Sequence, residues 1–271
     1  MKFFQRSVRG FIASTAVLGV LAYGGVVGFF YVGQESLIFM PTTLPASHQF
    51  LLPDTTEVSL AVDGATLSAL HFKQPGAKGV IFFLHGNGGN LVSWLRNTDF
   101  YRKNNFDLFM IDYRGYGKST GSIESEAQLH ADVMAAWNWI APQYEGRKRV
   151  IFGRSLGTTL AAKLSTQVRA DWTVLVSPFY SLDGMRRDVY PFLPGALMRY
   201  TFRTDQWLPH ANSPVSILHG DRDEVIGYSH AEKLQMAFPR VELIKINGGT
   251  HYNLHQLPQY VDALSERLAK L

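Results

Sequence analysis

From residue 56 onward the chain alternates short apolar runs with segments of helical spacing, and this alternation limits the fold more than any other feature. Runs this short and this continuously apolar are typical of strands buried on both faces of a mainly parallel sheet. They cover residues 79–85, 106–112, 149–153, 172–177, 215–220 and 241–246. Ahead of them, residues 56–62 and 66–72 flank Asp63-Gly64, a two-residue signal for an antiparallel hairpin.

Amphipathic segments separate these runs. Residues 125–140 and the C-terminal residues 260–271 each carry apolar side chains on one helical stripe. We therefore expect an α/β fold with a doubly wound, mainly parallel sheet of about eight strands and helices on both faces. In such folds, functional sites form at the carboxyl ends of the strands.

Residues 10–34 contain no charged side chain. As a helix, these 25 residues would span about 37 Å, more than the roughly 30 Å hydrocarbon core of a bilayer. The stretch also contains Phe29-Phe30-Tyr31, an aromatic cluster suited to a membrane interface. We expect residues 1–34 to form a single-pass membrane anchor and residues 35–271 to form one catalytic domain.

Two other interpretations of this stretch are a cleaved signal peptide and a buried core helix. The apolar core of a signal peptide is usually shorter, roughly 7–15 residues. A core helix is disfavoured because the stretch has no polar face and precedes the domain. Lys2, Arg6 and Arg9 lie before the apolar stretch, and the first acidic residue is Glu35. The positive-inside rule then places the N-terminus in the cytoplasm and the catalytic domain on the extracytoplasmic side.

Charge and cysteine content exclude several classes of function. Without the three basic residues at the N-terminus, 23 basic side chains remain against 22 acidic ones, so the body is nearly neutral. The sequence has no basic patch that would indicate nucleic-acid binding. The chain has no cysteine, which excludes a disulfide framework, a thiolate metal site and a cysteine nucleophile.

One connection is longer than the others. About 36 residues with four prolines and many aromatic side chains separate the runs at 172–177 and 215–220. An insertion this long and this apolar predicts a cap over a pocket, at about 179–214.

The motif Gly153-Arg154-Ser155-Leu156-Gly157 follows one apolar run and precedes a small-residue helical segment. By itself G-x-S-x-G is weak evidence, because glycine and serine are common. In the order strand, turn, helix it predicts a nucleophile elbow, in which both glycines are required because the strand and helix pack too closely for side chains. The alternative is that Ser155 is only a helix N-cap.

A nucleophilic serine needs a base and an orienting acid. After Ser155, one strand end carries Asp221 and Asp223, and the next strand end carries His251 after a glycine turn. The order serine, acid, histidine is the order found in α/β-hydrolases. His85 and His219 each precede a glycine at a strand end, where a structural hydrogen bond is the better interpretation than catalysis or metal binding.

The segment 82–90, with sequence FFLHGNGGN, is typical of a loop that supplies backbone donors to an oxyanion. The expected donors are the amides of Asn87 and Leu156. A phosphate-binding loop is the alternative, but GNGGN matches neither common phosphate-binding pattern.

Together these motifs resemble the α/β-hydrolase fold serine hydrolases, and most closely the membrane-anchored α/β-hydrolase-domain proteins. That group includes acyl-protein thioesterases and lipid esterases. The segments ESLIFMP (35–41) and YRGYGKSTG (113–121) resemble the group's link from anchor to body and its loop beside the site. By the same resemblance Asp223 is the acid, since it lies three residues after Gly220. We interpret Asp112 and Arg114 as structural residues of the loop.

The resemblance implies a hydrolase that cleaves carboxylic ester or thioester bonds of an acyl substrate through an acyl-enzyme intermediate, without cofactor or metal. One alternative is a small-peptide hydrolase on the same fold. A second is a non-catalytic, membrane-tethered binding protein, because fold alone does not imply activity.

Overall fold

The computed structural model describes residues 2–95 and 97–271. An eight-stranded sheet forms the centre of the body, with strand order β10-β9-β8-β7-β4-β6-β3-β2. The strands are β2 (Thr55–Val62), β3 (Ala65–Phe72), β4 (Gly79–Leu84), β6 (Phe106–Ile111), β7 (Lys148–Arg154), β8 (Trp172–Val176), β9 (Val215–Gly220) and β10 (Glu242–Ile246). The predicted fold class, a mainly parallel sheet of about eight strands with helices, is confirmed.

The hairpin β2–β3 is antiparallel, as predicted, and its turn pairs Val62 with Ala65 across Gly64, which has a φ of 71°. β3 also pairs antiparallel with β6, and the strands from β6 to β10 pair in parallel. Every residue of β4, β6 and β9 is buried, which explains why these strands read as continuous apolar runs.

Helices cover both faces of the sheet. The helices of the body are α3 (Leu91–Trp94), α4 (Thr98–Lys103), α5 (Glu126–Ile140), α6 (Leu156–Ser165), α9 (Ser229–Ala237) and α10 (Pro258–Lys270). Alternate residues of β4 belong to two separate cores, because successive side chains of a strand point to opposite faces. Phe82 packs in the core that contains residues of α5, α6 and α9, whereas Phe83 packs in the core that contains residues of α3, α4 and α10.

The order of the strands reverses at β4, which lies between β7 and β6. The chain runs from β4 to β6 on one side and then returns to β7 on the other. A crevice at the carboxyl ends of such strands is where doubly wound folds bind ligands. A two-residue strand, β5 (Gly88–Gly89), follows β4 at this edge and pairs with β1 (Met40–Pro41).

The insertion between β8 and β9 is not uniform. Its first part contains α7 (Leu182–Val189) and η2 (Gly195–Leu197), neither of which has a buried residue. Its second part contains Tyr200 and Phe202, which are completely buried in the core, followed by α8 (Thr204–Trp207) and η3 (Leu208–His210). We use "the cap" below for residues 182–198.

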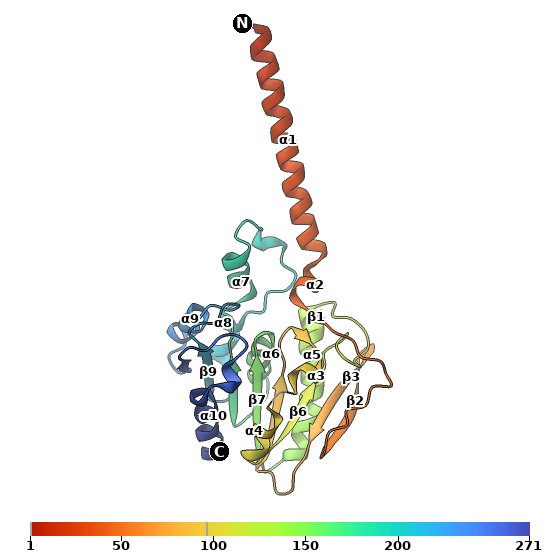
Figure 1. Cartoon of the computed structure of the whole chain (residues 1–271), viewed down its shortest axis with the longest axis vertical. Coiled ribbons are helices and arrows are strands. Elements are labelled where there is room, and N and C mark those ends of the chain that lie inside the picture. Colours follow the sequence, from red (N-terminus) through yellow and green to blue (C-terminus); the bar gives the residue numbers. More distant parts are fainter. Residues whose placement is uncertain (1, 96) are drawn as a thin grey trace.

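The N-terminal segment forms α1 (Lys2–Val32), followed by the short helix α2 (Gln34–Ile38). Figure 1 shows α1 standing clear of the body, with α2 and α7 beside the end of α1 that meets it. Within α1, Gly10–Val32 is long and apolar enough to cross a membrane, and none of its residues is buried. By length and composition this helix qualifies as a membrane anchor or as a signal sequence.

Candidate active site

Ser155 lies on a sharp turn between β7 and α6, with φ 52° and ψ −120°. A side chain on either neighbouring glycine would clash with backbone. A Cβ on Gly153 would lie 2.4 Å from the Gly157 carbonyl oxygen, and one on Gly157 would lie 2.0 Å from that of Leu84. Ser155 occupies the N-cap position of α6, but its hydroxyl makes no capping hydrogen bond and is left for other partners.

The structure brings Ser155, His251 and Asp223 together from three separate strand ends. The Ser155 Oγ lies 3.1 Å from His251 Nε2, and His251 Nδ1 lies 2.8 Å from Asp223 Oδ2. All three residues are buried. Because an ionised carboxylate can only accept, Nδ1 of His251 carries the proton, and Nε2 is free to accept from the serine hydroxyl.

Asp223 is held in its ionised form. Burial by itself would raise the pKa of this carboxyl, but hydrogen bonds from His219 and His251 and from the Ile226 amide outweigh burial and hold the pKa well below its usual range. The amides of Val225 and Ile226 both donate to Asp223 Oδ1. A carboxylate this firmly ionised can orient the histidine and stabilise an imidazolium without taking its proton.

Asp221 is placed differently. Its Oδ1 accepts a hydrogen bond of 2.7 Å from the amide of Gly248, in the turn ahead of His251. The two aspartates at this strand end therefore have different partners. Asp223 contacts His251, and Asp221 accepts a hydrogen bond from the turn before His251.

The other histidines considered from sequence lie outside this triad. His219 is completely buried and donates from Nε2 to the Ile226 carbonyl, beside Asp223. His230 lies in α9 and contacts Asp188. His85 donates from Nδ1 to the carbonyl of Gly86 over 2.7 Å.

The contact of His85 bears on the predicted oxyanion donors. Because a trans peptide points its C=O and N–H in opposite directions, holding the Gly86 carbonyl also aims the Asn87 N–H. Gly86 adjoins Ser155, since a Cβ built on Gly86 would lie 3.3 Å from Ser155 Cβ. Leu156 is the first residue of α6, where backbone N–H groups have no partner within the helix. Both predicted donors thus lie beside Ser155.

The tyrosine-glycine loop, residues 113–121, is hydrogen-bonded to residues 85–90, the predicted source of oxyanion donors, which we call the oxyanion loop. The Tyr113 hydroxyl donates to the His85 carbonyl over 2.8 Å, and the Tyr116 hydroxyl donates to the Asn87 carbonyl over 2.6 Å. Asp112 accepts from the amide of Leu91. The contacts of Asp112 agree with the structural interpretation of this loop.

Arg114 fastens the same loop to α5. Its guanidinium makes a two-pronged ion pair with Asp132, at 2.6 and 2.8 Å, and donates to the carbonyl of Asp63 in the hairpin. The side chains of this pair are only 4% and 3% exposed. Arg114 therefore joins three elements behind the site.

Two cavities meet at Ser155 and share Asn87 and Val225. The first, which we call the cap cavity, has a volume of about 270 Å³ and lies between the cap and the N-terminal helices. The second, the rear cavity, lies on the other side of Ser155 and is lined by Arg154, His251 and Tyr260, among others. A substrate with a carbonyl at Ser155 can extend one part into each.

Sequence reasoning missed the lining that comes from the N-terminal segment, because it treated residues 1–34 as an anchor separate from the catalytic domain. Six of the residues that line the cap cavity come from α1 and α2: Val27, Phe30, Tyr31, Gln34, Leu37 and Ile38. The signal available in the sequence was their helical spacing, with the polar Gln34 inside an otherwise apolar stripe.

Comparison with known proteins agrees with this architecture. A family model described as "Serine aminopeptidase, S33" matches residues 75–204. The chain is 32% identical over 203 residues to alpha/beta hydrolase domain-containing protein 17B of Xenopus laevis, covering 72% of this chain and 68% of that protein. It is 30% identical over 244 residues to protein bem46 of Schizosaccharomyces pombe, covering 79% and 80%. Its match to protein 17C of Xenopus tropicalis, at 31% identity, covers 71% of this chain but only 62% of the relative.

Solved structures with low sequence identity share the fold. An esterase of Pyrococcus furiosus superimposes with a TM-score of 0.68 at 18% identity, covering 86% of this chain and 98% of that structure. An alpha-beta hydrolase of Vibrio vulnificus gives 0.66 at 21% identity, covering 79% and 81%.

Proposed function

The chain belongs to the α/β-hydrolase family, in the group of α/β-hydrolase domain-containing protein 17 and bem46, and we propose that it is a membrane-anchored serine hydrolase. Its substrates are carboxylic esters or thioesters. The observation that carries the proposal is the hydrogen-bonded chain from Ser155 Oγ through His251 to Asp223, with links of 3.1 and 2.8 Å. Two cavities that meet at the same hydroxyl support it.

In the first step Ser155 Oγ attacks the substrate carbonyl carbon while His251 Nε2 takes the hydroxyl proton. The amides of Asn87 and Leu156 stabilise the negative charge that develops on the carbonyl oxygen. Collapse of the tetrahedral intermediate expels the alcohol or thiol, which leaves with the proton from His251. Water, deprotonated by the same nitrogen, then releases the acid from the serine.

The proposed location follows from α1. The helix is a single-pass anchor, and the basic residues ahead of Gly10 stay in the cytoplasm. The hydrolase body then lies on the extracytoplasmic side. A cleaved signal sequence would predict instead that the mature protein is recovered in the soluble fraction.

A peptidase is the second candidate, because the matching family model carries the name of a serine aminopeptidase. An aminopeptidase has to bind the positively charged N-terminus of a peptide, for which a carboxylate is the natural partner. Among the described residues, neither cavity at Ser155 is lined by Asp or Glu, and the rear cavity presents Arg154. This charge distribution favours esters over peptides.

A direct comparison of ester and anilide substrates tests whether the protein is an esterase or a peptidase. We expect the full-length protein in detergent micelles to hydrolyse p-nitrophenyl octanoate with a higher kcat/KM than alanyl- or leucyl-p-nitroanilide. A higher kcat/KM on the anilides would replace the esterase proposal with the peptidase.

The role of Ser155 is tested by substitution against a matched control. We expect Ser155→Ala to lower kcat on p-nitrophenyl butyrate by at least about 10⁴-fold and to abolish labelling by a fluorophosphonate probe. Ser177 is the control, since it is buried at the neighbouring strand end and also has a φ of 52°. Ser177→Ala should keep the label. A wild-type protein that neither labels nor turns over would instead be a non-catalytic binding protein.

A further inference from the structure

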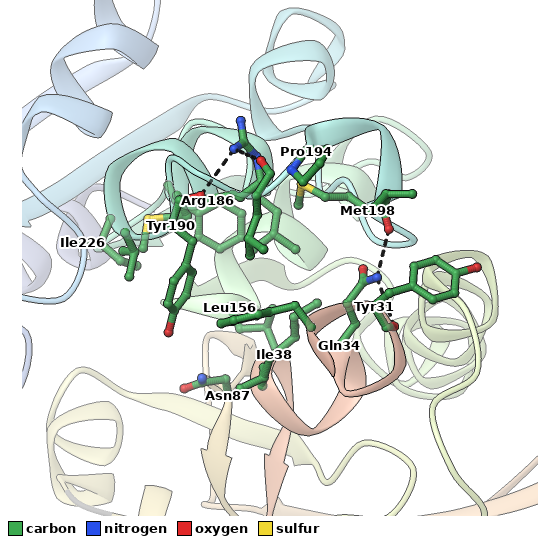
Figure 2. A pocket seen from close by; sticks show the side chains of 18 of the residues that line it. Tyr31, Gln34, Ile38, Asn87, Leu156, Arg186, Tyr190, Pro194, Met198 and Ile226 are labelled. Carbon is green, nitrogen blue, oxygen red and sulfur yellow. Dashed lines mark hydrogen bonds between the residues drawn. The ribbon is translucent and has the colours of Figure 1, made fainter. Parts of the chain in front are cut away.

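The cap cavity has one wall that belongs to the membrane helix. Val27, Phe30, Tyr31, Gln34 and Ile38 follow one another at helical spacing, so they form one stripe along α1 and α2 that faces the cavity. Figure 2 shows Tyr31, Gln34 and Ile38 of this stripe opposite the cap residues Tyr190, Pro194 and Met198, with Leu156 between the two sides.

This wall is fixed in place by polar contacts with the cap. The Tyr23 hydroxyl donates to the Phe192 carbonyl over 2.9 Å. Gln34 donates to the Leu197 carbonyl over 2.9 Å and accepts from the Arg199 amide over 2.8 Å. Because these bonds tie the C-terminal half of the cap and the residue after it to α1 and α2, the helix is part of the body at this point and not a loose tether.

Aromatic packing and an ion pair reinforce the junction. The ring of Phe30 packs against those of Tyr190 and Phe192, with centroids 4.9 and 6.2 Å apart. Arg199 forms an ion pair with Glu35. The junction therefore combines apolar and polar contacts across residues more than 150 positions apart in the chain.

The lining of the cap cavity suits an apolar occupant. Among the described residues that line it, the one charged side chain is Arg186, and its guanidinium bonds to Asp183 and to the Leu193 carbonyl of the cap itself. The other lining residues are mostly aliphatic or aromatic, and Ser155 lies at the inner end beside Leu156. A chain of methylenes fits this lining better than a polar or charged group does.

The outer rim of the cavity is apolar as well. Large apolar side chains of the cap are exposed beside the end of α1: Val189 at 53%, Tyr190 at 38%, Phe192 at 51% and Leu197 at 39%. Apolar and aromatic groups gathered where an apolar helix meets the body are typical of a surface that lies on a membrane. The stripe on α1 starts inside the apolar stretch Gly10–Val32. With α1 as the proposed anchor, the cavity would begin at the depth of the bilayer interface.

We propose that the end of α1 and α2 forms half of the acyl-binding site, and that the substrate is a long-chain acyl ester or thioester drawn directly from the adjacent leaflet. The acyl chain occupies the cap cavity between the stripe and the cap, and its carbonyl reaches Ser155 without crossing water. The leaving group lies in the rear cavity. This inference rests on the proposed esterase function.

A substitution on the helix itself tests the wall. Val27→Trp should fill the outer part of the cap cavity, far from the nucleophile, and so discriminate by chain length. Val26 is the matched control, because it is the adjacent valine, is 42% exposed and does not line the cavity. Both variants keep the full chain and are assayed in phosphatidylcholine vesicles with p-nitrophenyl palmitate and p-nitrophenyl butyrate.

We expect Val27→Trp to lower kcat/KM for the palmitate at least about tenfold. Each methylene that is excluded from an apolar pocket weakens the binding of the transition state substantially. The rate on the butyrate should change by less than about twofold, and Val26→Trp should leave both rates unchanged. A Val27→Trp variant that handles both esters like wild type overturns the inference. A wild type that hydrolyses neither ester overturns the proposed function instead.

Membrane delivery is tested by where the substrate is placed. The palmitate ester is loaded either into the vesicles that contain the protein or into separate protein-free vesicles, and initial rates are compared. We expect faster hydrolysis in the first case and equal rates for the water-soluble butyrate. Equal rates for the palmitate would mean that the acyl chain enters the cap cavity from water, which contradicts the proposal.

Discussion

Ser155 combines an unusual backbone conformation with a hydroxyl that the surrounding structure leaves for chemistry. A non-glycine residue at φ 52° and ψ −120° lies outside the common regions and stores on the order of 1–3 kcal/mol of strain. The strain persists because β7, α6 and the end of β4 pack closely around the turn, and the two flanking glycines make that contact possible. The turn is rigid, which suits a nucleophile that has to stay aligned with its base.

At this scale the closer of the two glycine contacts at the Ser155 turn predicts the larger effect. Gly157→Ala places a Cβ 2.0 Å from the Leu84 carbonyl oxygen and 2.7 Å from that of His85. Because both neighbours are backbone, β4 and α6 have to move apart. We expect a loss of roughly 3 kcal/mol or more in unfolding free energy, and a fall in kcat/KM, measured by urea unfolding and ester hydrolysis in micelles. Gly227→Ala is the control, since its Cβ would meet only Ser229 Oγ at 3.7 Å. Equal effects in both variants would contradict the steric explanation.

Single residues also mark where sequence reasoning stops. The sequence placed two aspartates at one strand end, and residues two positions apart there share a similar environment. Only the backbone path separates them: it turns Asp223 toward His251 and Asp221 toward the amide of Gly248. The preference for Asp223 therefore came from family resemblance, and its catalytic role stays a prediction that substitution has to test.

Among the elements, the tyrosine-glycine loop supports the site from outside the two cavities at Ser155. It holds the carbonyls of His85 and Asn87 through two tyrosine hydroxyls, and it is itself fastened to α5 by the ion pair between Arg114 and Asp132. The geometry of the oxyanion loop therefore depends on α5, which contacts the tyrosine-glycine loop through Asp132.

Removing one partner of this buried pair leaves an uncompensated charge. We expect Asp132→Ala to lower the unfolding free energy by about 3–5 kcal/mol. Arg102→Ala is the control, because its ion pair with Asp54 is exposed, at 56% and 52%, and should contribute less than about 1 kcal/mol. Urea unfolding in detergent micelles measures both. If the two variants lost the same unfolding free energy, the buried ion pair between Arg114 and Asp132 would not be what holds the tyrosine-glycine loop on α5.

Elements buried on both faces were predictable from the sequence. The predicted runs agree with the strands within one or two residues. Strands such as β4, β6 and β9 are apolar throughout because both faces are buried, and they end where the polar loop begins. The run at 241–246 was also expected to be buried on both faces, but β10 lies at the edge of the sheet and only Ile246 is buried. Two features were not predictable. The pairing of β1 with β5 joins two-residue strands, too short for any periodic pattern. Tyr200 and Phe202 read as cap residues but are core residues, since an aromatic side chain does not indicate which surface it covers.

For the molecule as a whole, stability should depend on pH through His71. Burial lowers the pKa of this histidine to about 4 from its ordinary 6.5, and the nearby Lys73 and Arg147 act in the same direction. Its Nε2 lies 2.7 Å from the Tyr144 hydroxyl, which donates to Asp107. His71 is therefore neutral and donates from Nε2.

The sign follows from the two protonation states. Below pH 6.5 the unfolded chain takes up a proton that the folded chain does not, so stability present above pH 6.5 is lost as the pH falls toward 4. We expect a loss on the order of 2 kcal/mol between pH 7 and pH 5, a range above the ordinary pKa of the carboxylates.

His71→Gln tests this contribution, because the amide can donate to Tyr144 without titrating. His230, whose pKa burial also lowers, adds to the wild-type dependence, so the difference between wild type and His71→Gln isolates His71. Urea unfolding at pH 7 and pH 5 measures it. The same pH dependence in both proteins would assign the effect to other groups.

The relation between α1 and the cap is a whole-molecule property that the sequence did not reveal. An uncharged stretch of 25 residues predicts a helix and a hydrophobic environment. Its periodicity does not show which part of the protein contacts each face of that helix. Contacts such as that between Gln34 and Leu197 join residues far apart in the chain, and only the folded structure shows them.

The continuity of α1 with the cavity wall has a consequence for how such a protein could change during evolution or engineering. In many membrane enzymes the tether is interchangeable, and cutting or exchanging it alters only the address of the catalytic body. Here the same residues contribute to the cavity, so shedding the helix by proteolysis would open one side of the pocket beside Ser155. Grafting the body onto a foreign tether would alter the shape of that pocket as well as its location. In the proposed enzyme, membrane location and selectivity for the acyl chain depend on one stretch of chain and would have to be inherited together.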